Sequence, residues 1–454
     1  TIAGNVVIKV PDLRKPIVTA WHQIFQPPRD HQITTGPLQM TDSVPDVFKT
    51  GDGHEPGFKD TTTRSDRHGH HLIFPDGDTT LWHSLFVRMQ QARHIDGGIR
   101  ILYYGDSQIE GDRITAFLRK KLQEQFGGSG PGLISPKMVV DYTKSVRISS
   151  SPNWRRFTMR DFRDAIIASN RFGILLNFCT FTAPYDPSTG EEMESASVKV
   201  LPANLGYPNA ESYHRCRILA DRLTDSLHLE ILTPYHRISD HIPGQDGMVM
   251  LNYAFDRPQS QVEFRFYALR SPRIFAMALD DMTGLAVDNI PLRGSQGLDF
   301  SKTDTAFFKQ MVHTLNVGMI ILHFGVNVAM NVVDDYSYYE TAFHRELNLL
   351  KKLSNAPILV VGISDMMVDG GAMEMPNLEK IRAAQIRASG KAGCVFYDLY
   401  TAMGGRGSMK DWVASDPPLA RSDYIHFSNE GANLVAQKLY EAIMAEYDLF
   451  ELNQ

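Results

Sequence analysis

The chain has 454 residues, of which 43% are hydrophobic and 22% are charged, and its formal net charge is −6. This composition is that of an ordinary globular protein, and the length predicts two or more domains. The chain has no excess of basic residues that would indicate nucleic-acid binding. It also has no run of about 18 apolar residues that would predict a membrane span. The chain begins with Thr1 rather than Met, so we expect it to be processed or trimmed, which is compatible with a removed signal peptide.

Residues 1–80 are expected to be an N-terminal extension of uncertain fold, because Pro, Gly and Asp, which break helices and strands, recur along them. Residues 6–10 are a candidate strand within this extension. His68, His70 and His71 suggest a metal site, but no carboxylate or thiolate set has a matching spacing. We therefore interpret these histidines as loop residues and expect no metal or organic cofactor.

The chain has three cysteines, Cys179, Cys216 and Cys394, which lie far apart and show no zinc-type spacing. An odd number of three allows at most one disulfide. We expect buried thiols, which say little about the compartment in which the protein works.

An amphipathic helix is predicted over residues 81–92, and it leads into a buried strand at residues 101–104. The strand ends at Gly105, Ser107 follows, and a second helix is predicted from 113 to 125. A serine on a sharp strand-to-helix turn lies at the carboxyl edge of a parallel sheet, where ligand sites occur. Its hydroxyl is exposed there, and N–H groups at the helix start can face an anion. The simpler interpretation is that Ser107 caps the helix.

Residues 137–285 show a different pattern, with short alternating or β-rich runs separated by turns. Strands at this spacing favour an antiparallel sandwich over further α/β units. We therefore expect an inserted β-rich domain in this part of the chain. The predicted strands cover residues 138–140, 145–148, 173–178, 196–201, 227–232, 248–255 and 261–269.

The α/β pattern returns at about residue 286, so residues 81–136 and 286–454 are predicted to be the two parts of one α/β core. Alternating strands and helices predict a parallel sheet with helices on both faces. The predicted strands cover residues 319–324, 357–361 and 394–397, and the predicted helices cover 339–353, 378–389 and 429–447.

Asp423 and His426 stand just before the final predicted helix. A carboxylate three residues before a histidine can orient the imidazole ring, which can then accept the proton of Ser107. The order Ser, Asp, His along the chain matches one known order of catalytic triads. The alternative is that Asp423 is only a helix-start residue, as we expect of Ser428.

Asn327 follows another predicted strand, and Gly325 permits a tight exit from that strand. The side-chain amide of Asn327 can donate to an oxyanion at the same edge of the sheet. A loop earlier in the chain, residues 293–297, carries Gly294 and Gly297, either of which can offer a backbone N–H that no side chain blocks. Asn and Gly are also ordinary turn residues, which is the competing interpretation.

These four blocks, in this order, resemble the SGNH (GDSL-like) hydrolase superfamily. Its blocks are similar here to Gly105-Asp106-Ser107, the loop 294–297, Gly325-Val326-Asn327 and Asp423-x-x-His426. The resemblance implies an α/β fold with a flavodoxin-like three-layer core around a parallel sheet, plus an inserted β-sandwich lobe. This chain has Gln108 where the name-giving Leu stands and Val328 where an Asp often follows the Asn.

The resemblance also implies roles for single residues. Ser107 would be the nucleophile, His426 the base and Asp423 the partner of that base. The oxyanion donors would be the backbone N–H of Ser107, the amide of Asn327 and the N–H of Gly297, with Gly294 as the alternate.

A β-sandwich between the first two blocks resembles the carbohydrate-binding modules of bacterial cell-envelope members, notably peptidoglycan O-acetylesterases. The resemblance therefore implies an O-acetylesterase that acts on an acetylated carbohydrate or peptidoglycan, without a cofactor. It also implies a periplasmic, cell-envelope or secreted location in a bacterium. Two alternatives stay open: an O-acetyltransferase that uses the same triad, and a non-catalytic glycan-binding protein on a hydrolase fold.

Overall fold

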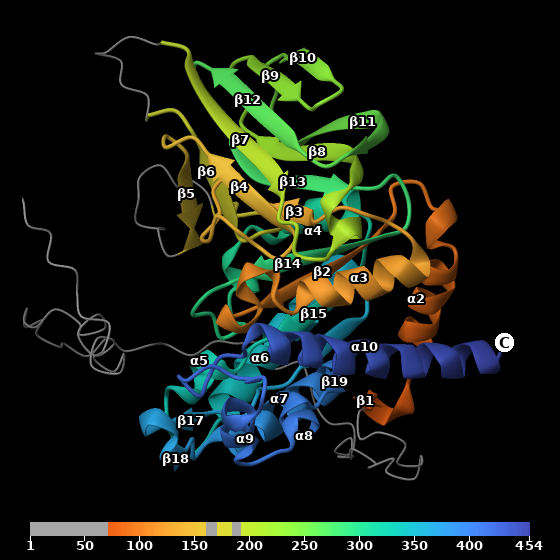
Figure 1. Ribbon diagram of the computed structural model, residues 1–454, viewed down its shortest axis with the longest axis vertical. Coiled ribbons are helices and arrows are strands. Elements are labelled where there is room, and N and C mark those ends of the chain that lie inside the picture. The colour runs from red at the N-terminus through yellow and green to blue at the C-terminus, as the bar shows by residue number, and fades with distance from the viewer. Residues whose placement is uncertain (1–70, 160–169, 184–191) are drawn as a thin grey trace, which may run out of the picture. The chain divides into compact units, whose positions relative to one another are not determined.

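The computed structural model describes residues 71–159, 170–183 and 192–454 of the chain (Figure 1). All of them lie in the compact unit Pro56–Gln454. The predicted strand at 6–10, His68 and His70 lie outside the described residues, and His71 is exposed. The prediction for the cysteines is confirmed, because all three are free and buried.

One mixed sheet is built mainly from parallel strands. Its strand order is β1-β19-β16-β15-β2-β14, and only β1 runs antiparallel to its neighbour. Numbered along the chain, the five parallel strands stand in the order 2-1-3-4-5, which reverses direction between β2 and β15. The bounds are β1 (Leu72–Ile73), β2 (Ile99–Gly105), β14 (Leu285–Pro291), β15 (Val317–His323), β16 (Ile358–Val361) and β19 (Val395–Tyr397).

Strand β2 is buried on both faces, because successive side chains of a strand point to opposite sides. Leu102 and Tyr104 belong to one apolar cluster, and Ile101 and Tyr103 belong to a second one. Helices therefore cover both faces, and Figure 1 shows α3 and α10 side by side. The first cluster includes α4 (Thr305–Thr314), α6 (Ser337–Ser354) and α7 (Leu378–Ala392), and the second α2 (Thr80–Gln90), α3 (Thr115–Phe126) and α10 (Asn429–Leu452).

Shorter elements connect these helices and strands. The short helices are α5 (Val326–Ala329), α8 (Leu399–Met403) and α9 (Ser408–Ala414), and a small hairpin consists of β17 (Met367–Val368) and β18 (Met373–Glu374). The 3₁₀ turns are η1 (Pro75–Gly77), η2 (Ala92–His94), η3 (Ser107–Asp112), η5 (Pro208–Glu211), η6 (Phe300–Lys302) and η7 (Asp369–Gly371).

Two antiparallel sheets hold most of the β-rich stretch, and a third apolar cluster contains side chains from both. Their strand orders are β10-β9-β12-β7-β4 and β11-β8-β13-β6-β5, and β3 pairs with β13. Alternate residues of β12 are buried, as expected for a strand with one face in a core. The bounds are β3 (Gly132–Ile134), β4 (Val146–Ser150), β5 (Arg155–Thr158), β6 (Asn177–Thr180), β7 (Glu194–Pro202), β8 (Tyr213–Asp221), β9 (Leu227–Leu232), β10 (Arg237–Ile242), β11 (Val249–Gln259), β12 (Val262–Ala268) and β13 (Arg273–Asp280).

The predicted α/β class with a parallel sheet is confirmed, and so are most predicted strands and helices. The predicted strand at 138–140 is wrong, because these residues form bends and Val139 is half-exposed. Residues 173–176 are turns, so β6 begins only at Asn177. Helix α4 and the strands β1, β3, β5, β8, β10, β13 and β14 were not among the predicted elements. The division of the chain at residues 80, 136 and 285 stays a prediction.

A buried cluster of charges joins both kinds of sheet. Arg100 of β2 pairs with Asp288 of β14 at 2.5 Å and with Asp280 of β13. Asp280 also accepts from Arg215 at 3.0 Å and from Arg217 at 2.5 Å, both on β8. Burial alone would raise the pKa of Asp280, but the three guanidinium groups lower it. This carboxylate therefore stays charged, and it compensates three buried cations.

We expect Asp280→Asn to reduce the free energy of unfolding by about 3–5 kcal/mol, because it leaves buried guanidinium groups without their counter-charge. Urea unfolding measured at neutral pH checks this value. The matched control is Asp246→Asn, at an exposed position between β10 and β11, which should change stability by less than about 0.5 kcal/mol. Equal effects of the two substitutions would contradict a stabilising role for the cluster.

Candidate active site

Ser107 lies two residues beyond the carboxyl end of β2, at the start of η3. The side chain of Asp106 caps this turn by accepting the Gln108 N–H at 3.0 Å, so the cap is Asp106 and not Ser107. The helix predicted from 113 to 125 is confirmed as α3, which begins at Thr115. Between Ser107 and α3, Gly111, at φ 73°, interrupts the 3₁₀ turn.

The structure brings Ser107, His426 and Asp423 together in one chain of hydrogen bonds. The Oγ of Ser107 lies 2.8 Å from Nε2 of His426, and Nδ1 of that imidazole lies 2.8 Å from Oδ2 of Asp423. Asp423 is not a helix cap, because Ser428 caps α10 by accepting the Gly431 N–H at 3.0 Å. The predicted arrangement of a hydroxyl, an imidazole and a carboxylate is therefore present in space.

The carboxylate of Asp423 also holds its own loop. Its Oδ1 accepts the N–H groups of Ile425 at 3.0 Å and His426 at 2.9 Å. Burial alone would raise the pKa of Asp423, but the hydrogen bonds from His426 and Ile425 lower it to about 2. The carboxylate is thus charged at every pH well above 2, and it can stabilise a positive charge on the imidazole.

Two side chains that the sequence analysis gave no role fasten the histidine loop to the serine turn. Gln108 is fully buried, donates to the Ile425 carbonyl at 2.7 Å and accepts the Phe427 N–H at 3.3 Å. Arg113 donates to the Phe427 carbonyl at 2.7 Å and to the Ser107 carbonyl at 2.6 Å. Both residues flanking His426 are therefore bound to the segment that carries Ser107.

The candidate oxyanion donor Asn327 lies in α5, just after β15, and β15 pairs with the strand β2 that precedes Ser107. Gly325 has φ 149°, and a Cβ there would lie 2.8 Å from the side chain of Ile363, so the sharp exit from β15 requires glycine. Asn327 is half-buried, and its amide donates to the Ser295 carbonyl at 2.9 Å. An amide carries two N–H bonds, and no acceptor for the second is found among the described residues.

The two candidate glycines differ in their surroundings. Gly297 is buried against Phe324, and its N–H donates to the Ser295 hydroxyl at 3.0 Å. Gly294 is exposed at φ 78°, and no acceptor for its N–H is found among the described residues. The engaged N–H of Gly297 argues against this glycine, which the resemblance favours, and leaves Gly294 as the candidate donor.

Comparison with known proteins supports the fold. No family model matches the chain, and no curated protein matches it. A solved structure of a peptidoglycan O-acetylesterase matches with a TM-score of 0.65 and 21% identity, covering 83% of this chain and 99% of that chain. The chain therefore shares the fold of that solved structure, and its similarity to an O-acetylesterase agrees with the resemblance of its sequence motifs.

Two further solved structures match smaller parts of the chain. An acetyl xylan esterase covers 35% of this chain and 81% of its own at 16% identity, with a TM-score of 0.28. A GDSL-like lipase from Parabacteroides merdae covers 35% of this chain and 73% of its own at 17% identity, with a TM-score of 0.26. At these scores neither structure adds to the fold assignment.

We expect Gln108→Met to slow the reaction of Ser107 with a fluorophosphonate about 10- to 100-fold, because the loop of His426 loses two of its anchors. Labelling rates measured by mass spectrometry, corrected for the folded fraction, check this value. Gln437→Met, at an exposed position of α10, is the matched control and should label like the wild type. A wild-type rate in Gln108→Met would mean that these hydrogen bonds do not position the imidazole.

Proposed function

We propose that the protein is a serine esterase that removes O-acetyl groups from a carbohydrate or peptidoglycan substrate. The observation that carries this proposal is the 2.8 Å contact between Ser107 Oγ and His426 Nε2, continued by the 2.8 Å contact from His426 Nδ1 to Asp423. A hydroxyl, an imidazole and a charged carboxylate in this order form the arrangement that activates a serine for acyl transfer.

The reaction then has two steps. Ser107 Oγ attacks the carbonyl carbon of the acetyl ester, and His426 takes the hydroxyl proton and passes it to the departing sugar oxygen. The acetyl group is now bound to Ser107. A water molecule loses a proton to His426 and attacks the acetyl carbon, acetate leaves, and the proton returns to the serine oxygen. Asp423, charged throughout, stabilises the imidazolium in both steps.

The negative oxygen of each tetrahedral intermediate needs donors at the same edge of the sheet. We assign this role to the Ser107 N–H, the Asn327 amide and the Gly294 N–H. Gly294 replaces Gly297 in this assignment because the Gly297 N–H already donates to Ser295. Such donors stabilise charge that develops only in the transition state.

The glycan part of the proposal rests on the β-rich residues. In this proposal they form a lobe inserted into an α/β core and hold a polymer while its acetyl group reaches Ser107. The similar solved structure is of a peptidoglycan O-acetylesterase, and the match covers 99% of that chain. This similarity supports a cell-envelope glycan as substrate and a location outside the cytoplasm. No helix in the described part of the chain is long and apolar enough to cross a membrane.

Ser107→Ala should release acetate from p-nitrophenyl acetate and from acetylated glycans at less than about 10⁻³ of the wild-type rate. The fold should be unchanged, because the substitution removes a half-buried hydroxyl and no core volume. Acetate assays together with thermal unfolding check both statements. Wild-type enzyme that hydrolyses neither substrate would favour a non-catalytic glycan-binding protein, and transfer of acetyl to a sugar in preference to water would favour an O-acetyltransferase.

Asn327→Ala should lower kcat about 10²- to 10³-fold and change KM little, because the lost donor acts mainly on the transition state. Steady-state kinetics on p-nitrophenyl acetate separate the two constants. Asn331→Ala, in the exposed loop just beyond α5, is the control and should behave like the wild type. A rise in KM at unchanged kcat would assign Asn327 to substrate binding instead.

A further inference from the structure

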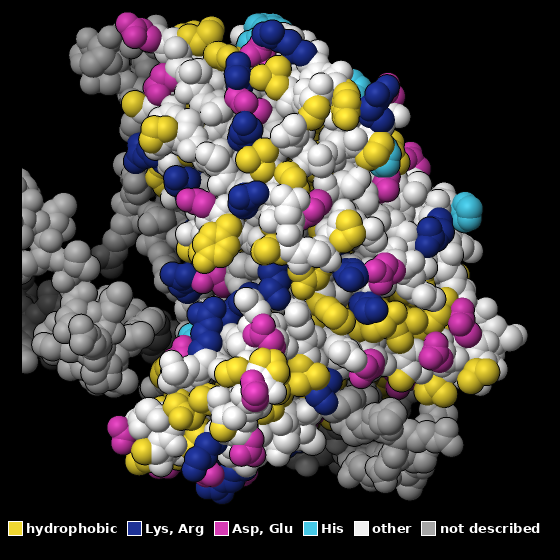
Figure 2. Space-filling view, viewed as in Figure 1, with side chains coloured by type: hydrophobic (Ala, Val, Ile, Leu, Met, Phe, Trp, Pro, Cys, Tyr) yellow, Lys and Arg dark blue, Asp and Glu magenta, His cyan; other side chains and the backbone are white. Residues whose placement is uncertain are grey.

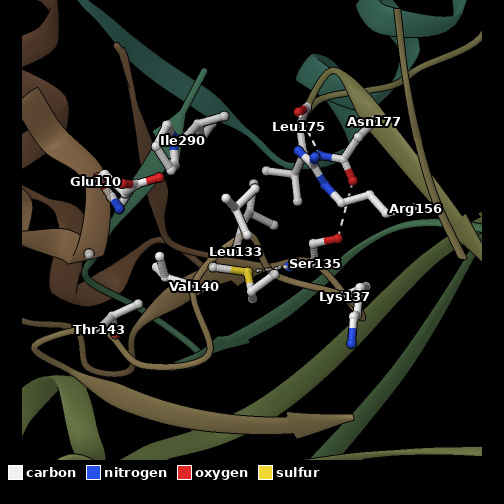
Figure 3. Close-up of a pocket in the computed structure, with 15 residues that line it drawn as sticks. Glu110, Leu133, Ser135, Lys137, Val140, Thr143, Arg156, Leu175, Asn177 and Ile290 are labelled. Carbon is white, nitrogen blue, oxygen red and sulfur yellow. Dashed lines mark hydrogen bonds between the residues drawn. The ribbon is translucent and has the colours of Figure 1, made fainter. Parts of the chain in front are cut away.

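A small cavity of about 40 Å³ lies between the serine turn and the β-rich residues (Figure 3). On one side, Figure 3 shows Glu110 of η3 and Ile290 of β14. On the other side it shows Ser135 and Asn177, which come from the β-rich stretch or its entry. A water molecule takes about 10–15 Å³ of such a volume, so the cavity has room for a group of about three or four non-hydrogen atoms.

The cavity lies close to the proposed nucleophile. Glu110 lines it and follows Ser107 by three residues, so their Cα atoms are at most about 11 Å apart. Pro291 also lines it, and this residue is level with Gly105 in the sheet, at the edge from which the serine turn departs. A glycan whose acetyl ester is at Ser107 therefore has other substituents of the same or the next ring within reach of the cavity.

Most of the surface that faces the cavity is apolar. The acid of the lining, Glu110, is already bound to Arg293 by two hydrogen bonds, and Arg156 already interacts with another group. Lys137, the third charged residue, is partly exposed to solvent. An uncharged ligand group with an apolar part suits such a lining better than a charged one. The apolar wall consists of Leu133, Met138, Val139, Val140, Leu175, Ile290 and Pro291.

Asn177 brings a buried amide to the lining of the cavity, and only 3% of this residue is exposed. Two neighbours fix the orientation of the amide. Its Oδ1 accepts from the Ser135 hydroxyl at 3.1 Å, and its Nδ2 donates to the Leu175 carbonyl at 2.8 Å. The nitrogen carries a second N–H, for which no acceptor is found in the part of the chain that the structure describes. A buried donor without an acceptor is unfavourable, so a ligand that brings an acceptor into the cavity is favoured.

Resting on the proposed esterase function, we propose that this cavity binds a second, uncharged acyl group of the glycan while the reacting acetyl ester lies at Ser107. The carbonyl oxygen of that acyl group accepts the second N–H of Asn177, and its methyl group packs against the apolar wall. An acetyl group has the size, the single acceptor and the apolar end that the cavity requires. The acyl group is either N-linked, as on an amino sugar, or O-linked, as a further ester of a neutral sugar.

Two matched pairs of oligosaccharides test the proposal and separate the two linkages. One pair is a chito-oligosaccharide and the corresponding cello-oligosaccharide, which has hydroxyl groups in place of the N-acetyl groups; both are O-acetylated at the neighbouring position. The other pair is fully O-acetylated xylobiose and xylobiose with a single O-acetyl group. Wild-type enzyme should show about tenfold higher kcat/KM per ester group, through a lower KM, on the more acylated member of at least one pair.

Two variants of the cavity should lose this preference. Asn177→Asp keeps the acceptor for the Ser135 hydroxyl and removes both N–H donors of the amide. Val140→Phe fills the cavity from a half-buried position in the loop before β4, and it tests the proposal also where Asn177→Asp does not fold. In both variants the ratio of kcat/KM between the two members should fall to about 1, through a higher KM for the more acylated member.

The matched control is Val87→Phe, at an exposed position of α2, which makes the same change outside the cavity and should keep the wild-type ratio. Equal wild-type activity on both members of each pair would overturn the inference and leave the proposed esterase function standing. An unchanged ratio in the two cavity variants, or equal losses on both members, would overturn it as well. Wild-type enzyme that hydrolyses p-nitrophenyl acetate and none of the oligosaccharides would contradict the proposed glycan substrate itself, and the inference with it.

Discussion

The register of three parallel strands decides where the candidate site can form. Gly105 at the end of β2 is level with Pro291 of β14 and His323 of β15. Two hydrogen bonds continue this alignment beyond the strands, from Leu292 N–H to the Gly105 carbonyl and from Asp106 N–H to the His323 carbonyl. Three segments therefore leave the sheet side by side. A slip by one residue would shift a loop by about 3.3 Å and turn every side chain of that strand to the other face.

This alignment brings the segments that carry the proposed nucleophile and the proposed oxyanion donors to one edge of the sheet, although they are far apart in the sequence. Ser107 follows β2, Gly294 follows β14, and Asn327 follows β15. The order of the sheet reverses between β2 and β15, and ligands of such sheets bind at the carboxyl ends beside this reversal. The sheet sets the positions of these three segments, and the segments carry the proposed reactive groups.

The histidine reaches this place in a different way, because no strand of the sheet ends at its loop. Gln108 and Arg113 hold it from the serine turn, and the Met367 N–H donates to the Tyr424 carbonyl at 3.0 Å on the other side. Tyr424 has φ 58°, a conformation that costs a non-glycine residue about 1–3 kcal/mol. These contacts offset that cost, and they orient a ring that lies 319 residues from its serine.

Sequence reasoning could predict the elements whose pattern is local. The apolar runs of β2 and β15 are strands buried on both faces, and the short spacing from Asp423 to His426 already places a carboxylate beside an imidazole. The role of Gln108 could not be predicted in this way, because its partners lie 317 and 319 residues away. The buried Gln108 beside Ser107 is visible in the sequence only as a departure from the motif of the superfamily that the sequence resembles.

Other elements escaped prediction because charges interrupt their pattern. Strand β8 contains Arg215 and Arg217, which are buried in the ion cluster although arginine normally indicates an exposed face. The helix predicted from residue 113 differs from α3 by only two residues at its start, which is Thr115. The choice between Gly294 and Gly297 depends on the Ser295 hydroxyl, which accepts the Gly297 N–H. The orientation of that hydroxyl is set by the tertiary structure, so it could not be predicted from the sequence.

The same ion cluster connects the β-rich residues to the sheet that carries Ser107. Asp280 on β13 is bound to Arg100 on β2, and Asp288 on β14 accepts the Leu133 N–H at 2.7 Å beside the cavity. The side chains of these ion pairs are buried, whereas on the face drawn in Figure 2 positive and negative side chains are interspersed. Breaking such pairs costs several kcal/mol, which favours one fixed arrangement of the β-rich residues against the catalytic edge. Under the proposed esterase function, such a fixed arrangement would let binding energy from distant parts of a glycan orient its ester at Ser107. A small ester has no such parts to bind, so its hydrolysis would depend on Ser107, the loop of His426 and the proposed oxyanion donors alone.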